Sequence, residues 1–364
     1  MINGKTVAVV VPSYNEETQI GVVIDTMPDF VDRIVVVNDC SKDRTAEIVR
    51  EYIAKEKANT PEIPRLPTEI EPTFFNRADI VVMEMRRAEE PKYPPHVVFN
   101  ENDADRIVLI NNVKNTRVGG AILIGYKWCR DHGIDCTAVM AGDAQMDPDE
   151  LYSICAPVVF DGIDYVKGNR LRHKASRVMV PKKRYFGNSI LSAMTKVASG
   201  YWTVSDTQTG YTAISLSALN AIDLYDIYRT YGVPNDILIK LNIARCTLRE
   251  VPIKPVYSVG EQSKMKIRKV IPTVSWLLIK GFFKRILKKY LINDFHPIFL
   301  FYLLGLIASL VGLYFLIYVL YGLIAQVGVS VGTYLGFVTM LVASLVFVGF
   351  AMWFDVYDNE RLQR

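Results

Sequence analysis

Charged side chains are absent from one long stretch of this chain, since residues 297–354 contain no Asp, Glu, Lys or Arg. The stretch is long enough for two bilayer crossings of about 20 residues each, with a turn available near positions 326–333. The whole chain is 50% hydrophobic with a mean hydropathy of +0.17, which is too apolar for an ordinary soluble enzyme. The residues before position 270 or so have a normal soluble composition, so the sequence predicts a soluble domain followed by a membrane anchor.

The cysteine pattern of a zinc or disulfide protein is also missing. The cysteines are scattered without CxxC spacing or a nearby histidine cluster, so we expect reduced thiols and neither kind of site. The first residues lack the basic and apolar regions of a signal peptide, and residues 6–11 are expected to form only a short strand. The five cysteines are Cys40, Cys129, Cys136, Cys155 and Cys246.

The net charge of +4 is small, and its location is more informative than its size. Basic residues flank the apolar stretch on both sides, which by the positive-inside rule places both flanks in the cytoplasm. We therefore expect an integral membrane protein with its soluble domain on the cytoplasmic face of the cell membrane, and no nucleic-acid partner. The flanking basic residues are Arg268, Lys269, Lys280, Lys284, Arg285, Lys288, Lys289, Arg361 and Arg364.

The segment just before the first crossing has its own pattern. Between residues 270 and 295, apolar side chains alternate with a basic face. This pattern is typical of amphipathic helices that lie in the membrane interface rather than cross it. The apolar positions are Ile271, Val274, Leu277, Leu278 and Phe282.

The first part of the chain repeats one unit of structure. Apolar runs at residues 6–11 and 33–37 each end in a polar turn and continue into a helical pattern, and further runs follow at 106–110 and 137–140. Strand, turn and helix in alternation predict a parallel α/β sheet, in which ligands bind at the carboxyl ends of the strands.

This alternation is interrupted by residues 59–105, which are rich in proline and charge. Two pieces within them resemble strands, at 79–85 and 96–99. Because a structureless loop of this length is unusual in a compact domain, we interpret the segment as an inserted β-hairpin or flap. A mobile surface insertion is the alternative.

The most informative stretch is VMAGDAQMDPD at residues 139–149. Its apolar start predicts a buried strand, and Asp143 and Gln145 follow where that strand ends. Carboxylate and amide oxygens suit Mg²⁺ or Mn²⁺, which usually complete their coordination shell with water and substrate phosphates.

Several motifs occur in an order typical of one family. The chain resembles the family-2 glycosyltransferases of the GT-A fold over about residues 5–265, excluding the insertion. With two hydrophobic segments after the domain, it is similar to the branch that makes polyprenyl-phosphate sugars, such as dolichyl-phosphate glucose and mannose synthases. The motifs are VVVPSYNEE, VVNDCSKDRT, RVGGA, MAGDAQMDP, YVKGNR, SDTQTGYTAIS and REVPI.

The resemblance implies an α/β fold, a Rossmann-like GT-A domain with a mostly parallel sheet. This catalytic domain would occupy residues 1–265, amphipathic juxtamembrane helices 266–296, and a two-helix transmembrane anchor with a short tail 297–364.

The resemblance also assigns a donor site for a nucleotide sugar. Its members are Pro12, Tyr14 and Glu16 for the base and ribose, Asp39 for the base, and Gly120, Asp143 and Lys264. For Asp39 a turn cap is the alternative, for Gly120 close packing, and for Lys264 an anchor to anionic lipid.

Asp143 and Gln145 match the metal and diphosphate ligands of the family. The usual Asp-x-Asp-x-Gln has Ala141 at its first acid here, so the chain supplies fewer protein ligands, and the nucleotide diphosphate would supply the missing oxygens.

The acceptor site implied by the resemblance contains Arg170, Arg184 and Asn188, which match the lipid-phosphate ligands. Arginine suits a phosphate because its planar fork donates two parallel hydrogen bonds. Asp206 and Asp236 are assigned with Arg170 and Asp143 to the catalytic centre, where the two would position and recognise the sugar. Asn235 replaces the first acid of the family's acidic pair.

The expected reaction is an inverting transfer of a hexose from a nucleotide sugar to dolichyl or undecaprenyl phosphate. MAGDAQMDP is more like the glucose-type synthases, which favours UDP-glucose or another UDP-hexose, with GDP-mannose as the alternative. The polyprenol and a homo-oligomeric state are left open.

Two other functions are weighed. A membrane polysaccharide synthase usually carries Q-x-x-R-W, and none of the four tryptophans follows an arginine. A non-catalytic nucleotide-sugar-binding scaffold is suggested only by Ala141.

Overall fold

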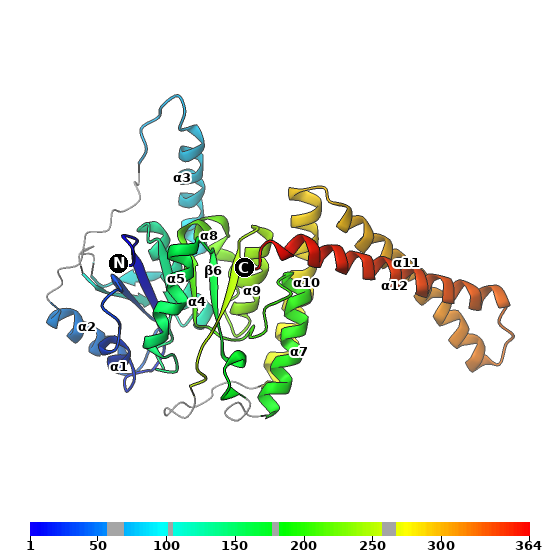
Figure 1. The fold of residues 1–364 in the computed structure, drawn as a ribbon, viewed down its shortest axis with the longest axis horizontal. Coiled ribbons are helices and arrows are strands. Elements are labelled where there is room, and N and C mark those ends of the chain that lie inside the picture. The colour runs from blue at the N-terminus through cyan, green and yellow to red at the C-terminus, as the bar shows by residue number, and fades with distance from the viewer. Residues whose placement is uncertain (57–68, 101–104, 177–181, 257–266) are drawn as a thin grey trace.

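The computed structural model describes residues 1–56, 69–100, 105–176, 182–256 and 267–364, except for the side chains of 182–188 and 267–270. In this part of the chain, eight strands form one sheet in the order β3-β4-β2-β1-β5-β7-β6-β8 (Figure 1). The strands are β1 Val7–Ser13, β2 Arg33–Asn38, β3 His96–Val98, β4 Ile107–Asn112, β5 Cys136–Val139, β6 Tyr165–Asn169, β7 Thr212–Ser215 and β8 Leu248–Pro252.

The centre of the sheet is parallel. Strand β2 pairs in parallel with β4 and β1, and β1 with β5, whereas β7 runs antiparallel between β5 and β6. Parallel strands covered on both faces need apolar side chains on both faces, which explains the unbroken valine runs of β1 and β2. The predicted fold class, a mostly parallel α/β sheet, is confirmed.

Helices cover both faces of the sheet. Ala8 and Val10 of β1 belong to the core on the α4 side, and Val7, Val9 and Val11 to the core under α1 and α5. The helices of the domain are α1 Ile20–Asp25, α2 Thr45–Lys55, α3 Arg77–Glu89, α4 Val118–Asp131, α5 Leu151–Asp161, α7 Lys182–Ser199, α8 Leu216–Ala221 and α9 Val233–Ile243.

The prediction of an inserted β-hairpin is wrong in its first half. Residues 79–85 lie inside helix α3, which projects from the domain in Figure 1. Asp79 in its first turn and Arg86 and Arg87 in its last turn interact favourably with the helix dipole. Only the second piece is a strand, β3, which pairs antiparallel with β4 at the sheet edge.

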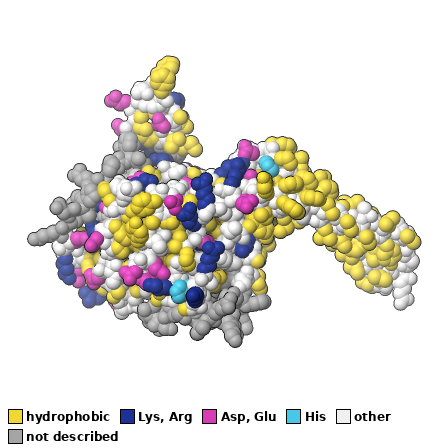
Figure 2. All heavy atoms as spheres, viewed as in Figure 1, with side chains coloured by type: hydrophobic (Ala, Val, Ile, Leu, Met, Phe, Trp, Pro, Cys, Tyr) yellow, Lys and Arg dark blue, Asp and Glu magenta, His cyan; other side chains and the backbone are white. Residues whose placement is uncertain are grey.

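A helical arm leaves the domain after α10, Ile267–Leu287, and a short π-helix, Lys288–Asn293. Its helices, α11 Pro297–Ala325 and α12 Val331–Glu360, lie side by side, and they contain 18-residue stretches with mean hydropathies of 2.5 and 2.3. At 1.5 Å per residue, each is about 45 Å long. Figure 2 shows apolar side chains over most of the arm's visible surface, so both helices are long and apolar enough to cross a membrane.

A buried polar network joins the base of the arm to the domain. Arg285 of α10 forms two hydrogen bonds with the Asp355 carboxylate of α12, at 2.7 and 2.9 Å, and both side chains are fully buried. The same guanidinium donates to the carbonyls of Val197 and Ala198 at the end of α7. Gly200 has φ +76°, and a Cβ there would lie 2.7 Å from the guanidinium, so a glycine is required at this helix end.

The last residues of the chain return to the sheet. The Leu248 amide donates to the Leu362 carbonyl at 2.7 Å, and the Arg364 amide donates to the Leu248 carbonyl at 3.0 Å. Leu362 is 6% exposed and belongs to the main hydrophobic core. Both ends of the arm are therefore attached to the same side of the domain.

We predict that Asp355→Ala lowers the free energy of unfolding by about 3 to 5 kcal/mol, because it leaves the Arg285 guanidinium buried without its carboxylate. Denaturant unfolding of the purified protein in detergent measures the change. Arg361→Ala is the control at the same helix end, where Arg361 pairs with Asp358 at 3.0 Å but is 60% exposed. Its effect should be at most about 1 kcal/mol, and equal losses in the two variants would contradict the prediction.

Candidate active site

The loops at the carboxyl edge of the sheet carry unusual backbone geometry. Four of them, the loops after β1, β2, β4 and β5, each contain a described non-glycine residue with positive φ. Such conformations cost free energy and cluster at functional sites. The residues are Asn15 at 55°, Cys40 at 62°, Arg117 at 65° and Ala144 at 56°.

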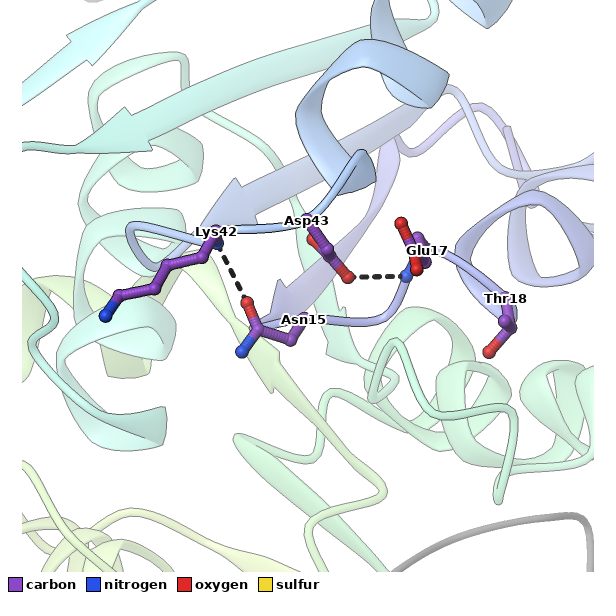
Figure 3. A pocket seen from close by; sticks show the side chains of 5 residues that line it. All are labelled: Asn15, Glu17, Thr18, Lys42 and Asp43. Carbon is purple, nitrogen blue, oxygen red and sulfur yellow. Dashed lines mark hydrogen bonds between the residues drawn. The ribbon is translucent and has the colours of Figure 1, made fainter.

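The loops after β1 and β2 are joined by hydrogen bonds. The Asn15 amide donates to the Ser41 hydroxyl at 3.0 Å, and the Lys42 amide donates to the Asn15 side chain at 2.9 Å. Between the loops lies an open hollow of about 360 Å³ (Figure 3). Its lining residues are Asn15, Glu17, Thr18, Lys42 and Asp43.

The predicted base and ribose ligands are close in sequence to Asn15 and Glu17, which line this hollow, but do not line it themselves. Pro12 belongs to β1, Tyr14 follows the strand, and both are partly buried. The Glu16 amide donates to the Thr45 hydroxyl at 2.9 Å, which fixes the loop to the start of α2. The hollow therefore has a rigid frame before any ligand binds.

Asp39 connects the loops after β2 and β4. It is 3% exposed, and its Oδ1 accepts hydrogen bonds from the Asn112 side chain and from both the amide and the hydroxyl of Thr116, at 2.7 to 2.9 Å. A Cβ on Gly120 would lie 2.3 Å from the Thr116 hydroxyl. Close packing is thus a sufficient reason for the glycine, and Asp39 has a structural role whether or not it contacts a base.

Asp143 and Gln145 follow β5, as the sequence predicted. The Gln145 amide donates to Asp143 Oδ1 at 3.2 Å, and a Cβ on Gly142 would lie 2.5 Å from the Ser13 hydroxyl. The loop that carries the two oxygen-bearing side chains therefore passes the end of β1 at Gly142, whose amide donates to the Pro12 carbonyl at 3.3 Å. The described residues contain no group of three His, Cys, Asp or Glu side chains that could hold a metal. One carboxylate and one amide fit a cation that takes its other ligands from water and a diphosphate.

Arg170 and Asp206 form the most strongly bonded pair at this edge. Arg170 Nε and Nη2 donate to the two carboxylate oxygens at 2.8 and 3.0 Å, and its amide adds a bond at 3.1 Å. Asp206 is 2% exposed, whereas Arg170 is 27% exposed. Burial acts to raise the pKa of Asp206, but the hydrogen bonds and charge of Arg170, with the Lys167 charge, outweigh it, so the pKa is lowered. Asp206 is therefore ionised.

Glu250 of β8 holds the segment that contains Asp206. Its Oε1 accepts from the amides of Ser205 and Asp206 at 2.9 and 3.1 Å, and its Oε2 accepts from the Asn169 side chain at 2.7 Å. The sequence reasoning missed this residue, although the motif REVPI contains it. An acid inside a short apolar strand was the available signal.

Lys167 of β6 is a second residue that the sequence reasoning missed. It is fully buried and donates to the Thr209 carbonyl. Burial lowers the pKa of Lys167 to about 8, although the charges of Asp206 and Glu250 oppose the shift. Two acidic side chains, Asp206 and Glu250, therefore lie among two basic ones, Lys167 and Arg170, at the end of β6.

Asp236 lies in a different set of contacts. Its Oδ2 accepts from the Tyr228 amide at 2.9 Å and from the Lys240 ammonium at 2.6 Å. Its neighbour Asn235 accepts a hydrogen bond from the side chain of Gln208, two residues after Asp206, at 3.5 Å. The structure thus brings Asn235, rather than Asp236, towards Asp206.

Three predicted ligands cannot be placed. Arg184 and Asn188 belong to the backbone of α7, but their side chains lie outside the described part of the structure. Lys264 lies outside the described residues altogether. Their roles remain predictions.

Sequence comparisons agree with the motifs. Residues 8–62 match the model of glycosyl transferase family 2. A UDP-N-acetylglucosamine–dolichyl-phosphate N-acetylglucosaminyltransferase of Methanococcus voltae is 27% identical over 255 residues, covering 70% of this chain and 87% of the relative. An uncharacterised protein of Methanocaldococcus jannaschii is 24% identical over 265 residues, covering 72% and 86%.

Solved structures with a related arrangement include glucosyl-3-phosphoglycerate synthase of Mycobacterium tuberculosis. Its complex with Mn²⁺, UDP and glucosyl-3-phosphoglycerate aligns with a TM-score of 0.45 and 16% identity, covering 78% of this chain and 80% of that one. Its complex with Mg²⁺ and UDP aligns with a TM-score of 0.44 and 16% identity, covering 78% of this chain and 79% of that one.

The family match begins in β1 and continues through β2 and α2, so it includes the two loops that frame the hollow in Figure 3. The two relatives extend the likeness to 255 and 265 residues, which are 70% and 72% of this chain. The resemblance to the family-2 glycosyltransferases that the ordered motifs indicate is thereby confirmed, with the family model itself matched over residues 8–62.

Proposed function

We propose that this protein transfers a sugar from a nucleotide sugar to the phosphate of a membrane polyprenyl phosphate, with inversion at the anomeric carbon. The main support is the position of α7. Ser192 of this helix contacts Thr207, next to Asp206, at 3.1 Å, and the end of the helix is bonded to Arg285 beside the apolar arm. One helix thus borders both the candidate site and the base of the arm.

The relative of Methanococcus voltae supports the same class of reaction through its name, which includes a UDP-sugar donor and a dolichyl-phosphate acceptor. A UDP-sugar donor is therefore proposed for this chain. UDP-glucose and UDP-N-acetylglucosamine are the first donors to compare.

The chemistry requires little proton transfer. A phosphate oxygen of the lipid forms the new bond to the anomeric carbon, and the bond from that carbon to the nucleoside diphosphate breaks. A phosphomonoester has a second pKa of about 6, so it is largely a dianion at neutral pH and needs no strong base. Arg170, held by Asp206, would bind the attacking phosphate. Mg²⁺ or Mn²⁺ held by Asp143 and Gln145 would supply positive charge for the leaving diphosphate.

Helix α10 supports a position at the membrane surface. Val274 and Leu278 are buried against α7 and α9, and Ile286 is buried against the start of α11, whereas the opposite side carries exposed apolar residues. A helix with a second, unpaired apolar face flanked by lysines suits the lipid interface. The exposed residues are Trp276, Ile279, Phe283 and Leu287, with Lys284 and Lys288 beside them.

The decisive experiment is a transfer assay with purified protein. Undecaprenyl and dolichyl phosphate are each offered with UDP-glucose, UDP-N-acetylglucosamine and GDP-mannose, and lipid-linked sugar is measured by mass spectrometry. Transfer to one lipid phosphate is the expected result. Transfer to a sugar hydroxyl alone would instead indicate a polysaccharide synthase, and tight donor binding without any transfer would indicate a scaffold.

For the cation site, we predict that Asp143→Asn reduces transfer by roughly a hundredfold or more, because it removes the motif's carboxylate from the leaving-group side. EDTA should have the same effect on the wild type, and added Mn²⁺ should reverse it. Asp149→Asn, at an exposed position on the same loop, is the control and should be nearly neutral. Full activity of the wild type in EDTA would disprove metal dependence.

For the acceptor site, we predict that Arg170→Lys lowers kcat/KM for the lipid by roughly ten- to hundredfold. An ammonium keeps the charge opposite Asp206 but loses the planar fork, and a charge-assisted hydrogen bond is worth about 1.5 to 3 kcal/mol. Donor binding, measured by calorimetry without lipid, should not change.

Arg172→Lys is the matched control, since Arg172 lies on the same turn but is 55% exposed and 4.0 Å from Glu250. If Arg170→Lys weakened donor binding and left the lipid KM unaltered, Arg170 would belong to the donor site.

For the orientation, we predict that the turn between α11 and α12 lies outside the cell and the tail inside. A Cβ on Gly328 would meet no atom within 4 Å, so Gly328→Cys should be tolerated and should react with an impermeant thiol reagent in intact cells. Arg361→Cys should react only after the membrane is opened. Cys40, the exposed native cysteine, is replaced by serine in both variants, and the reverse labelling pattern would overturn the orientation.

A further inference from the structure

The C-terminal tail contacts the segment that carries Asp206. The Gln363 side-chain oxygen accepts from both the amide and the hydroxyl of Thr203, each at 2.7 Å. Thr203 is three residues before Asp206, and the described residues 201–211 form neither helix nor strand. A segment without regular structure depends on side-chain contacts for its position. Gln363 supplies one of these contacts, and Glu250 supplies the next, at Ser205 and Asp206.

The other end of the Gln363 amide is connected to the arm. Its Nε2 donates to the Asn359 carbonyl at 3.1 Å. Asn359 is fully buried, and its side chain accepts from Asn242 at 2.7 Å and from the Lys289 ammonium, and donates to Asp355. The hydrogen bonds of Gln363 thus run from the buried network at the base of α12 to the start of the active-site segment.

Strand β8 contacts both the tail and the segment that carries Asp206. Gln363 forms a parallel bridge with Leu248 at the free edge of β8, and Glu250 lies two residues farther along the same strand. Thr203 is therefore held by the tail, and Ser205 and Asp206 by the strand on which the tail lies. A displacement of the tail would affect both sets of contacts.

We propose that Gln363 is a positioning residue for the sugar-transfer site, through which the end of α12 sets the placement of the Asp206–Arg170 pair. The inference builds on the proposed function, but it also predicts a structural effect that can be measured without turnover. Gln363 does not touch the reacting atoms in this account. It acts through Thr203 and the segment that follows.

The test uses the full-length protein in lipid nanodiscs and the variants Gln363→Met and Gln363→Glu. Methionine keeps the length of the side chain and loses both hydrogen-bonding groups, whereas glutamate keeps the oxygen that faces Thr203 and loses the donor that faces the Asn359 carbonyl. Losing a neutral hydrogen bond costs about 0.5 to 1.5 kcal/mol, so we expect kcat to fall roughly two- to tenfold in Gln363→Met. Donor binding should be unchanged, and Gln363→Glu should recover only part of the rate, because it restores the bonds to Thr203 but not the bond to Asn359. Arg361→Ala, on the same tail, is the control and should behave as the wild type.

A thermodynamic cycle with Thr203→Val separates positioning from general stability. If Gln363 acts through Thr203, the double variant should lose little more rate than either single variant. Additive losses in rate, or a lower Tm of Gln363→Met with unchanged kcat and KM, would overturn the proposal.

Amide hydrogen exchange provides the readout that is independent of activity. In Gln363→Met, the Thr203 amide should exchange faster, and so should the Ser205 and Asp206 amides. Faster exchange at Thr203 alone would show that the tail does not control the segment and would refute the proposal. If wild-type protein transfers no sugar to any lipid phosphate, the proposed function fails, and the exchange result still decides the role of the tail.

Discussion

The buried ion pair of Arg285 and Asp355 is the interaction on which the joint between the domain and the arm depends. Removing two charges from water is expensive, and the cost is offset only when the geometry is good and the remaining hydrogen-bonding groups are satisfied. Both conditions hold here, because Arg285 also donates to two carbonyls of α7 and Asp355 also accepts from Tyr290. Apolar contacts alone would allow several rotations of the arm about its axis. A fully bonded polar network selects one, so the orientation of the arm is determined where it meets α7, α10 and the end of β8.

The fold class could be predicted from the sequence because its signals are local and redundant. The valine runs of β1 and β2 are long, apolar on both faces and followed by polar turns, which only a covered parallel strand explains well. The two apolar helices of the arm could be predicted just as directly, because residues 297–354 contain no charged side chain. The run DIVVMEM, residues 79–85, resembles a strand when it is considered alone, but it lies inside helix α3 and outside the sheet. Outside the sheet a strand would leave its backbone groups unpaired, whereas a helix satisfies them within itself.

The candidate site was predictable where a motif fixes a strand end and not where a distant segment completes it. The position of Asp143 and Gln145 after β5 could be predicted, because the apolar residues of β5 are enough to identify that strand. Glu250 contacts Ser205, which lies 45 positions earlier in the chain, and Gln363 contacts Thr203, which lies 160 positions earlier. No local pattern encodes either contact. The pairing of Arg170 with Asp206, and the turning of Asp236 towards Lys240, depend on how the helices pack.

The charge arrangement at the end of β6 bears on the choice of acceptor. A sugar hydroxyl becomes a good nucleophile only when a base removes its proton, and an efficient base has a pKa near the working pH. Asp206 is held ionised by two bonds from Arg170, which lower its pKa and make it a weak base. Asp39 and Glu250 hold loops in place by accepting hydrogen bonds from backbone amides, and Asp143 and Asp236 accept from the Gln145 amide and from Lys240. Lys167, whose pKa is lowered to about 8 by burial, is fully buried and donates to the Thr209 carbonyl, so it is not exposed to an incoming sugar. A phosphate dianion brings its own negative charge and needs a cationic partner rather than a base. Arg170, partly exposed and oriented by a buried carboxylate, is suited to that role, and for this reason the site favours a lipid phosphate over a sugar hydroxyl.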